Sequence, residues 1–389
     1  MDYFFPDTPY AKMEDVMWNP LSMIRRPARS LLGIDIGTSS VKVAEIAGSA
    51  KEATLLSYGE LRSYGYLTRL REPLQSSALT MLESDVAEMI RNILEVSGAR
   101  SRRASVGIPL FSSFFTTLEL PPMTQQELQE AIPYQAQQIV PIPVSEVILD
   151  WEIIGRIGGT QGGGGQPREK LLVLLVAVPR EVVDRYVRIA KLAAVELEAL
   201  EVEAFSLVRA AFRGDQRTLA LLDIGARSTN MLVAEEGTVR LSRSIDASGS
   251  ELTSAVARSL GIGMGRAEAM KIAYGIGDAA SPDIRRLLTG VLETIVGELG
   301  KLVATYRRNY GKSVEALVLT GGSSTLPGLT TYLSERLSLP VSLAAPFRGL
   351  HYPQELEPVL EEIGPSFTVA VGLALRHAIP SAVTPQLSS

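Results

Sequence analysis

Cysteine is absent from this chain of 389 residues, and histidine occurs only twice, at His351 and His377. Without cysteine the chain has no disulfide framework and no thiolate metal site, which fits a reducing compartment. Two histidines leave almost nothing for an imidazole zinc site or a Ser-His-Asp triad, and we interpret both as structural residues. The composition therefore argues against disulfide scaffolds, zinc enzymes and triad hydrolases.

The sequence also lacks a large charge excess and a long apolar run. Its 38 basic and 43 acidic residues give a net charge of -5, so the chain has no overall attraction to nucleic acid, and we expect no such partner. The longest apolar run, Leu171 to Pro179, is about half of a membrane span and predicts a buried strand. The first residues have no secretory pattern, so we expect a cytoplasmic protein.

The chain is long enough for more than one domain core, because 46% of its residues are hydrophobic. Residues 1–29 combine aromatics and prolines with Arg25, Arg26 and Arg29, and they predict a poorly ordered tail. The alternative is a short docking segment for a partner or a membrane surface. A glycine-rich stretch at residues 158–167 predicts a flexible loop.

A short motif, in which an aspartate precedes a glycine turn, occurs twice in the sequence and is called the acidic turn below. Residues 31–37 predict a strand that runs into a tight turn, and the alternation from Ser40 onward predicts the returning strand. Asp223, Ile224, Gly225 and Ser228 repeat Asp35, Ile36, Gly37 and Ser40 at one constant offset. One such hairpin in each half predicts a duplicated fold with pseudo-twofold symmetry.

Each turn offers what a nucleotide triphosphate and its Mg²⁺ require, namely backbone N–H groups, small side chains and a carboxylate. One Asp-x-Gly alone is more often an ordinary turn, so the prediction depends on the pair in register. The residues predicted to take part are Asp35 and Asp223 for the metal or its water molecules, Gly37 and Gly225 for close backbone approach, and Thr38, Ser39 and Lys42 for the phosphate oxygens.

A third glycine turn completes the predicted site. The apolar strand that begins at Leu317 ends at Gly321 and Gly322, and a helix follows. Because glycine has no Cβ, this pair would let a flat adenine ring and its ribose lie against the backbone. The sequence therefore predicts ATP and Mg²⁺ as the ligands.

The remaining apolar patterns place these motifs on regular elements. Strands are predicted at residues 104–109, 147–154, 171–179, 197–202 and 316–319, and helices at 124–140, 180–194, 249–260, 266–273, 284–310, 326–337 and 366–378. The stretch between the two acidic turns is longer than one lobe requires. We therefore predict an inserted subdomain there.

The motifs resemble those of the actin, sugar-kinase and heat-shock ATPase superfamily over about residues 30–380. They occur in that order: a first phosphate loop at 33–42, a first connecting helix from Glu203, a second phosphate loop at 222–228, an adenosine motif at 320–328 and a second connecting helix from Ala370. Within the superfamily, Val106-Gly-Ile-Pro, Leu118-Glu-Leu-Pro-Pro-Met and Ile139-Val-Pro-Ile-Pro look like the PilM family of type IV pilus assembly, a relative of the division protein FtsA.

This resemblance implies further site residues. Glu203 would position the attacking water and share the catalytic role with Asp223, and Ser228 and Ser323 fall within the second phosphate loop and the adenosine motif. Glu268 and Lys271 match a helix that contacts ribose and adenine. They lie i,i+3 on one helix face, and a plain surface ion pair is the alternative interpretation.

The resemblance also implies an α/β fold of two actin-like or ribonuclease-H-like lobes around a nucleotide cleft, with an inserted α+β subdomain. The predicted boundaries are 30–109, 196–215 and 366–380 for the first lobe, 110–195 for the insertion and 216–350 for the second lobe. A PilM-like chain would be a cytoplasmic scaffold with at most slow ATPase activity. It would bind the cytoplasmic tail of a PilN-like inner-membrane protein, and reach the membrane only through partners.

Two alternatives stay open at this point. A small-molecule kinase would need an aspartate base at the cleft, and no residue stands out for that role. Self-association into filaments, as in FtsA, is the other. A P-loop ATPase has no support, because the chain contains no Gly-x-x-x-x-Gly-Lys-Ser/Thr motif.

Overall fold

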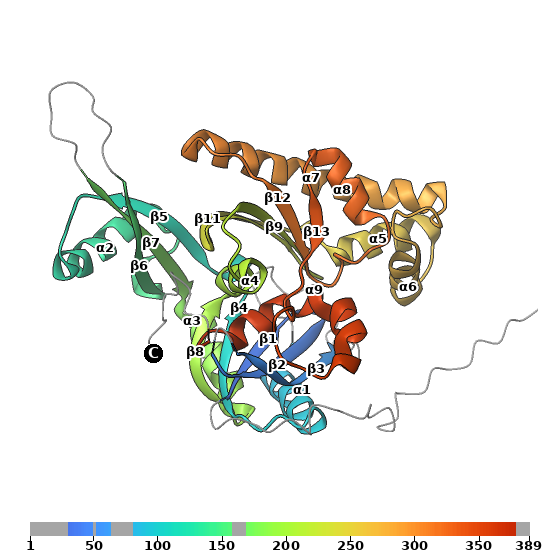
Figure 1. Cartoon of the computed structure of the whole chain (residues 1–389), viewed down its shortest axis with the longest axis horizontal. Helices are drawn as coiled ribbons and strands as arrows, with labels where there is room; N and C mark the ends of the chain where they lie inside the picture. The colour runs from blue at the N-terminus through green and yellow to red at the C-terminus, as the bar shows by residue number, and fades with distance from the viewer. Residues whose placement is uncertain (1–29, 50–51, 64–80, 158–168, 379–389) are drawn as a thin grey trace, which may run out of the picture.

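A computed structural model describes residues 30–49, 52–63, 81–157 and 169–378 of the chain (Figure 1). The predicted tail at 1–29 and the predicted glycine-rich loop at 158–167 lie outside these residues. Among the described residues, no helix combines the length and the apolar character needed to cross a membrane.

The first acidic turn belongs to a five-stranded sheet in the order β3-β2-β1-β4-β8. Its strands are β1 (Ser30–Ile36), β2 (Ser40–Ala47), β3 (Thr54–Arg62), β4 (Arg103–Ile108) and β8 (Glu196–Val202). β1, β2 and β3 pair antiparallel, whereas β4 and β8 continue the sheet in parallel. Helices α1 (Glu83–Val96) and α3 (Arg180–Leu192) pack together against this sheet.

A second sheet repeats this topology in the order β11-β10-β9-β12-β13. Its strands are β9 (Thr218–Ile224), β10 (Thr229–Glu235), β11 (Thr238–Ile245), β12 (Ala316–Thr320) and β13 (Val341–Leu343), and its helices are α5 (Gly249–Leu260), α6 (Met264–Tyr274), α7 (Pro282–Tyr310) and α8 (Leu329–Leu337). An antiparallel hairpin is again followed by parallel strands. The predicted α/β fold of two related lobes is confirmed, and Figure 1 shows the second lobe above the first.

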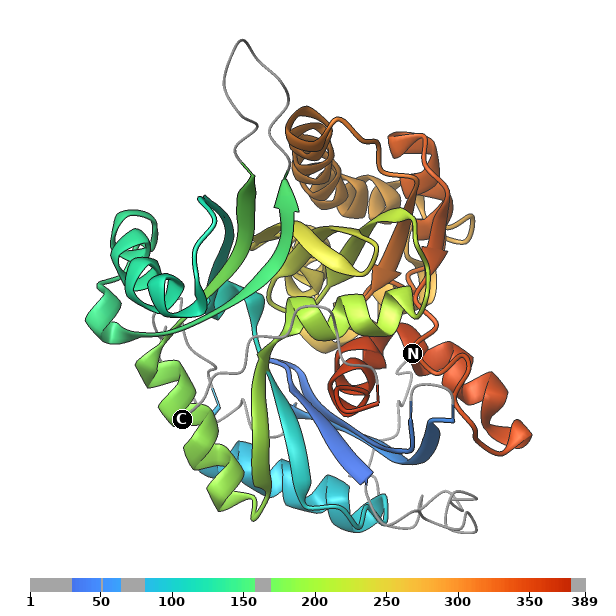
Figure 2. The ribbon, with the colours of Figure 1, turned by 60° about the vertical axis from the view of Figure 1, so that its left-hand side comes forward.

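A third sheet projects to one side of the two lobes (Figure 2). It has the order β5-β7-β6 and consists of β5 (Phe114–Leu120), β6 (Val147–Ile157) and β7 (Lys170–Pro179). Helix α2 (Gln125–Ile139) shares a separate apolar core with it, and two 3-10 turns, η4 (Leu110–Ser112) and η5 (Val144–Glu146), flank it. The boundary 110–195 stays a prediction, and α3, inside that range, contacts α1 of the first lobe.

Two adjacent helices, α4 (Glu203–Phe212) and α9 (Glu357–Ala374), lie between the lobes, with the 3-10 turn η6 (Gln354–Leu356) before the second. Their approach is close: a Cβ on Gly372 would stand 2.0 Å from the Ser206 carbonyl oxygen. A Cβ on Gly33 of β1 would stand 1.9 Å from the Ala370 carbonyl oxygen. Glycine is therefore required at both positions, because no side chain fits there.

Most predicted elements in the described residues occur with small shifts at their ends, but the last helix begins well before the predicted residue 366. Proline at position 365 lies inside α9 rather than before it. Its neighbours Phe367, Val369 and Ala370 are buried, and this tertiary packing outweighs the local cost of proline.

Candidate functional site

A cleft of about 840 Å³ lies between the two lobes, and it is lined from both acidic turns. Every residue that the sequence predicted for the nucleotide site lines this one cleft: Asp35, Gly37, Thr38, Ser39, Lys42, Glu203, Asp223, Gly225, Ser228, Glu268, Lys271, Gly321, Gly322 and Ser323. Residues far apart in the chain therefore meet as predicted. Their individual roles stay predictions.

The two turns are closed by the same hydrogen bond. The backbone N–H of Gly37 donates to the Ser40 carbonyl oxygen at 3.0 Å, and that of Gly225 donates to the Ser228 carbonyl oxygen at 3.0 Å. A Cβ on either glycine would stand 3.0 Å from that same oxygen. This approach is tight enough to explain why both turns carry glycine.

The side chains across the two sheets differ although the backbone is the same. In the first lobe Asp35 faces Lys42 and Lys42 faces Glu60 in cross-strand register. The Lys42 amine donates to the Ser40 hydroxyl at 2.7 Å and lies 3.4 Å from the Glu60 carboxylate. All three side chains in this row, those of Asp35, Lys42 and Glu60, are ionisable.

The corresponding row in the second lobe contains one ionisable group. Asp223 faces Asn230 and Asn230 faces Ser244. The Asn230 amide donates to Asp223 Oδ2 at 3.3 Å, and the Ser244 hydroxyl donates to the Asn230 oxygen at 2.9 Å. Thr320 donates a further hydrogen bond to Asp223 Oδ1 at 2.7 Å, so neutral donors hold this carboxylate.

The carboxyl groups of Asp35, Asp223 and Glu203 all line the cleft, and the pKa of each is raised. Burial, with contributions from Asp223 and Glu60, raises the pKa of Asp35 to about 6 against the lowering effect of Lys42. Burial and then the charges of Asp35 and Asp223 raise the pKa of Glu203 well above its usual range. Burial raises the pKa of Asp223, opposed by the hydrogen bonds that it accepts. A cation in this cleft would relieve the repulsion.

The donor set fits Mg²⁺, which prefers one or two carboxylates together with water and substrate phosphates. Asp35 and Asp223 are the carboxylates that the two turns supply. Among the residues that the structure describes, no group of three or more metal-ligating side chains comes together as a protein-only site. The metal role of Asp35 and Asp223 stays a prediction that depends on a bound phosphate.

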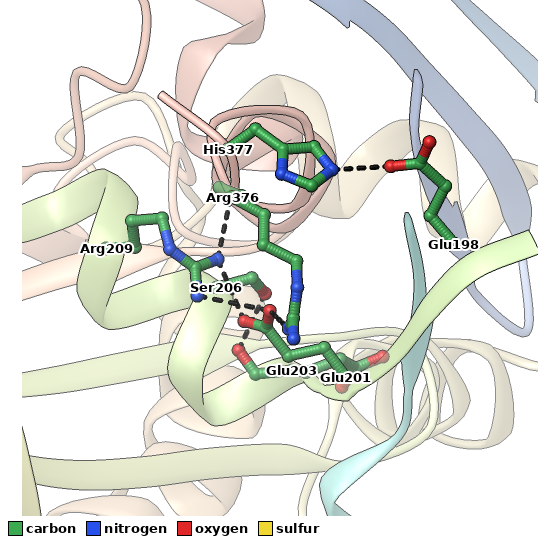
Figure 3. A network of polar contacts seen from close by, with 8 residues as sticks. Glu198, Glu201, Glu203, Ser206, Arg209, Arg376 and His377 are labelled. Atoms are coloured by element: carbon green, nitrogen blue, oxygen red, sulfur yellow. Dashed lines mark hydrogen bonds and ion pairs between the residues drawn. The ribbon is translucent and has the colours of Figure 1, made fainter. Parts of the chain in front are cut away.

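Glu203 occupies the start of α4, and its carboxylate accepts a hydrogen bond from the Leu110 backbone N–H. Behind it, a network of ion pairs fixes the connecting helices (Figure 3). Arg209 lies 2.8 Å from the Glu201 carboxylate, both side chains are fully buried, and Arg209 also donates to the Gly372 carbonyl oxygen at 2.8 Å. Arg376, just after α9, reaches the same Glu201. These contacts hold α4 to α9 only while every partner is present, because the loss of one partner would leave a buried charge uncompensated.

The two glycines of the adenosine motif have different surroundings. Gly321 has a φ of +89°, and a Cβ there would stand 2.6 Å from the Ile224 carbonyl oxygen and 2.8 Å from Asp223 Oδ1. Position 321 therefore requires glycine, because atoms of the second acidic turn occupy the space of a side chain. A Cβ on Gly322 would meet nothing within 4 Å, so Gly322 is the one with space for a ligand.

The ion pair predicted on the next helix lies at the cleft wall. Lys271 and Glu268 stand 2.8 Å apart, and only 3% of the lysine side chain is exposed. Lys271 also donates to the Gly249 carbonyl oxygen at 3.1 Å, and Thr253 donates to Glu268. A buried lysine of this kind differs from the plain surface ion pair that was the alternative.

Sequence reasoning missed the lining residues Glu60, Phe111 and Asn230. It did not single out Arg227 and Thr320, although they lie within the predicted second phosphate loop and adenosine motif. A signal existed for Asn230, which stands in the second strand pair where Lys42 stands in the first. No local pattern marks Phe111, because it lines the cleft from the turn that leads into the third sheet.

Comparisons with known proteins agree with this geometry. Residues 33–378 match the family of the type IV pilus assembly protein PilM. A solved PilM-PilN type IV pilus biogenesis complex superposes with a TM-score of 0.76 and 26% identity, covering 91% of this chain and 100% of that chain. The cell division protein FtsA of Pseudomonas aeruginosa is 26% identical over 360 residues, covering 82% of this chain and 84% of that protein.

A more distant structure supports the fold alone. The ethanolamine utilization protein EutJ from Carboxydothermus hydrogenoformans has a TM-score of 0.52 and 15% identity, covering 90% of each chain. Its likeness extends over both lobes, as a duplicated fold requires.

Proposed function

This chain belongs to the family of the type IV pilus assembly protein PilM, and we propose that it acts there as an ATP-binding, actin-like scaffold. The observation that carries the proposal is the meeting of two matching acidic turns and a glycine turn in one cleft. The family match favours this function over the small-molecule kinase. The identity with FtsA supports self-association as a further property to test.

Different cleft residues would contact the phosphates, the adenosine and the metal ion of Mg²⁺–ATP. Lys42 and the backbone N–H groups of the two turns would bind phosphate oxygens, and the surface beside Gly322 would receive the adenosine. When bound, Mg²⁺ would supply positive charge between the phosphates and the carboxylates of Asp35 and Asp223.

Hydrolysis by this site would be slow. Glu203 is the group placed to orient a water molecule, but burial and the charges of Asp35 and Asp223 raise its pKa well above its usual range and so favour the protonated carboxyl. A protonated carboxyl is a poor proton acceptor, so turnover depends on a cation lowering that pKa. The proposed role is thus nucleotide binding with at most slow ATPase activity.

The partner in this proposal is the cytoplasmic tail of a PilN-like inner-membrane protein. The similar solved structure is a PilM-PilN complex, and this chain covers all of the chain compared in it. The third sheet and α2 form the proposed docking unit, within the predicted insertion 110–195, and α2 exposes Tyr134 and Ile139. The chain would then be a cytoplasmic protein held at the inner membrane by its partner.

Calorimetry on the full chain tests the nucleotide half of this proposal. Gly322→Leu adds a side chain that the fold can accommodate and the adenosine cannot, so affinity for Mg²⁺–ATP should fall at least about tenfold, equivalent to about 1.4 kcal/mol. Gly297→Leu, at an exposed glycine of α7 with open space, is the matched control and should bind as the parent chain does. Absence of Mg²⁺–ATP binding by the parent chain would refute the proposal.

The partner half is tested with a synthetic peptide of the tail of the PilN-like protein. Tyr134→Ser together with Ile139→Ser should weaken peptide binding and leave Mg²⁺–ATP affinity unchanged, since α2 does not line the cleft. Equal peptide binding by the variant and the parent chain would remove α2 from the docking unit.

A further inference from the structure

One short segment both lines the nucleotide cleft and leads into the third sheet. It is the turn from Pro109 to Ser113, which contains η4 and joins β4 of the first lobe to β5 of the third sheet. Pro109 and Phe111 line the cleft, and β5 begins directly after the turn, at Phe114. A displacement of this turn would therefore reach the third sheet by the shortest covalent route.

Side chains from two other elements hold this turn. Glu203 of α4 accepts a hydrogen bond from the Leu110 backbone N–H. Arg227, from the second acidic turn, places its guanidinium carbon 4.9 Å from the centre of the Phe111 ring, which is a cation–π contact. The beginning of β5 is held as well, because the rings of Phe115 and Phe205 lie 5.6 Å apart.

Arg227 has a second attraction available in the same cleft. It lies between Gly225 and Ser228, whose turn is the one proposed to bind phosphate, and it lines the cleft with them. In the first acidic turn the equivalent position is Ser39, which carries no charge. A guanidinium binds phosphate through paired, charge-assisted hydrogen bonds, and these are stronger than its contact with an aromatic ring.

We propose that Arg227 binds the terminal phosphate of the nucleotide, and that this binding affects the third sheet through the turn from Pro109 to Ser113. With a triphosphate bound, the guanidinium leaves Phe111 and binds the terminal phosphate. The turn from Pro109 to Ser113 then keeps its contact with Glu203 and loses its contact with Arg227. With a diphosphate bound, the contact with Phe111 persists. The inference rests on the proposed function, because it requires the nucleotide to occupy this cleft.

The test compares Mg²⁺–ATP with Mg²⁺–ADP on the full chain by calorimetry. Arg227→Ala should weaken ATP binding roughly tenfold to a hundredfold, the loss of a charged hydrogen bond, while ADP affinity changes little. Phe111→Leu should act in the opposite direction and strengthen ATP binding about two- to fivefold, because the competing contact is gone. Arg258→Ala, at an exposed arginine of α5, should change neither affinity.

A second readout follows the turn itself. Hydrogen exchange of the peptide containing residues 109–113 should be faster in the parent chain with ATP than with ADP, and this difference should vanish in Arg227→Ala. The opposite signs expected for Arg227→Ala and Phe111→Leu separate the inference from a general loss of folding.

Two results would overturn the inference while leaving the proposed function intact. One is a parent chain that binds both nucleotides while Arg227→Ala keeps the same ratio of ATP to ADP affinity. The other is exchange at residues 109–113 that does not distinguish ATP from ADP in the parent chain. If the parent chain binds neither nucleotide, the proposed function itself fails and the inference fails with it.

Discussion

The two acidic turns share one backbone and carry different electrostatics. Both close with an N–H to carbonyl bond of 3.0 Å, yet the first aligns Asp35 with the charged Lys42 and the second aligns Asp223 with the neutral Asn230. The two turns therefore keep the same closing geometry. The side chains could differ, because they face the cleft and the neighbouring strands rather than close the turn.

This difference suggests a division of labour between the lobes. Beside the first turn the cation is Lys42 of β2, which can neutralise phosphate from the side of the first sheet. In the second turn the carboxylate is held by neutral hydrogen bonds, and the cation Arg227 stands at the tip of the turn, beside Phe111. The first turn would set affinity, and the second would respond to the kind of nucleotide.

The largest expected difference between the lobes concerns the strands behind the turns. Gly33 of β1 lies against the Ala370 carbonyl oxygen, whereas the equivalent position in β9 is the buried Leu221. Gly33→Ala should lower the free energy of unfolding by about 3 kcal/mol or more, since helix backbone occupies the space of its Cβ. Urea denaturation measures this, with Gly290→Ala in α7 as a control that should be neutral or slightly stabilising.

A smaller effect should separate Lys42 from Asn230. Lys42→Ala removes a charge that is proposed to contact phosphate and should weaken Mg²⁺–ATP binding about tenfold to a hundredfold, whereas Asn230→Ala removes a neutral hydrogen bond and should cost about two- to tenfold. Calorimetry of the two variants at one ionic strength provides the comparison. A larger loss for Asn230→Ala would contradict the division of labour.

The smallest expected effect is on the pH dependence of stability. The pKa of Asp35 is about 6 in the folded protein and 3.8 in a model compound, so the folded state binds this proton more tightly than the unfolded state. Its contribution is fully present below the unfolded pKa and is lost as the pH rises through the folded pKa. The ligand-free chain should thus gain stability as the pH falls from about 7 to about 5.

Asp35→Asn should flatten that gain and raise the free energy of unfolding at pH 7 by on the order of 1–2 kcal/mol. Asp223→Asn should stabilise less, because Thr320 and Asn230 donate hydrogen bonds that favour the ionised carboxylate. Thermal denaturation of the two variants between pH 5 and pH 7 measures the difference. Identical profiles would show that the two carboxylates share one environment.

The repeated turns were predictable because a local pattern specifies them: an apolar strand, an acidic residue at its end, and a glycine that the closing carbonyl requires. Thr320–Gly328 was recognisable for the same reason. The edge strands β3 and β11 were not predicted, since their side chains are only partly buried and their alternation is weak. Helix α9 was predicted too short, because its passage through proline at position 365 depends on tertiary packing.

Within the site, sequence patterns identified the residues around the cleft but could not separate their structural and ligand-facing roles. Gly321 and Gly322 look alike in sequence, yet only the backbone of β9 makes glycine obligatory at the first. The contact of Arg227 with Phe111 joins segments far apart in the chain, and no periodicity in either segment encodes it. Such information exists only once the lobes are assembled.

The glycine-lined face of the first sheet has a consequence for the order of folding during synthesis. Gly33 and Gly107 lie against α9, which consists of residues 357–374 and follows the second lobe in the chain. During synthesis on the ribosome, β1 is made before the second lobe, and α9, the helix that covers it, is made only after the second lobe. The first lobe is therefore completed only after the second lobe has been made, contrary to the usual order in which the domain synthesised first folds first.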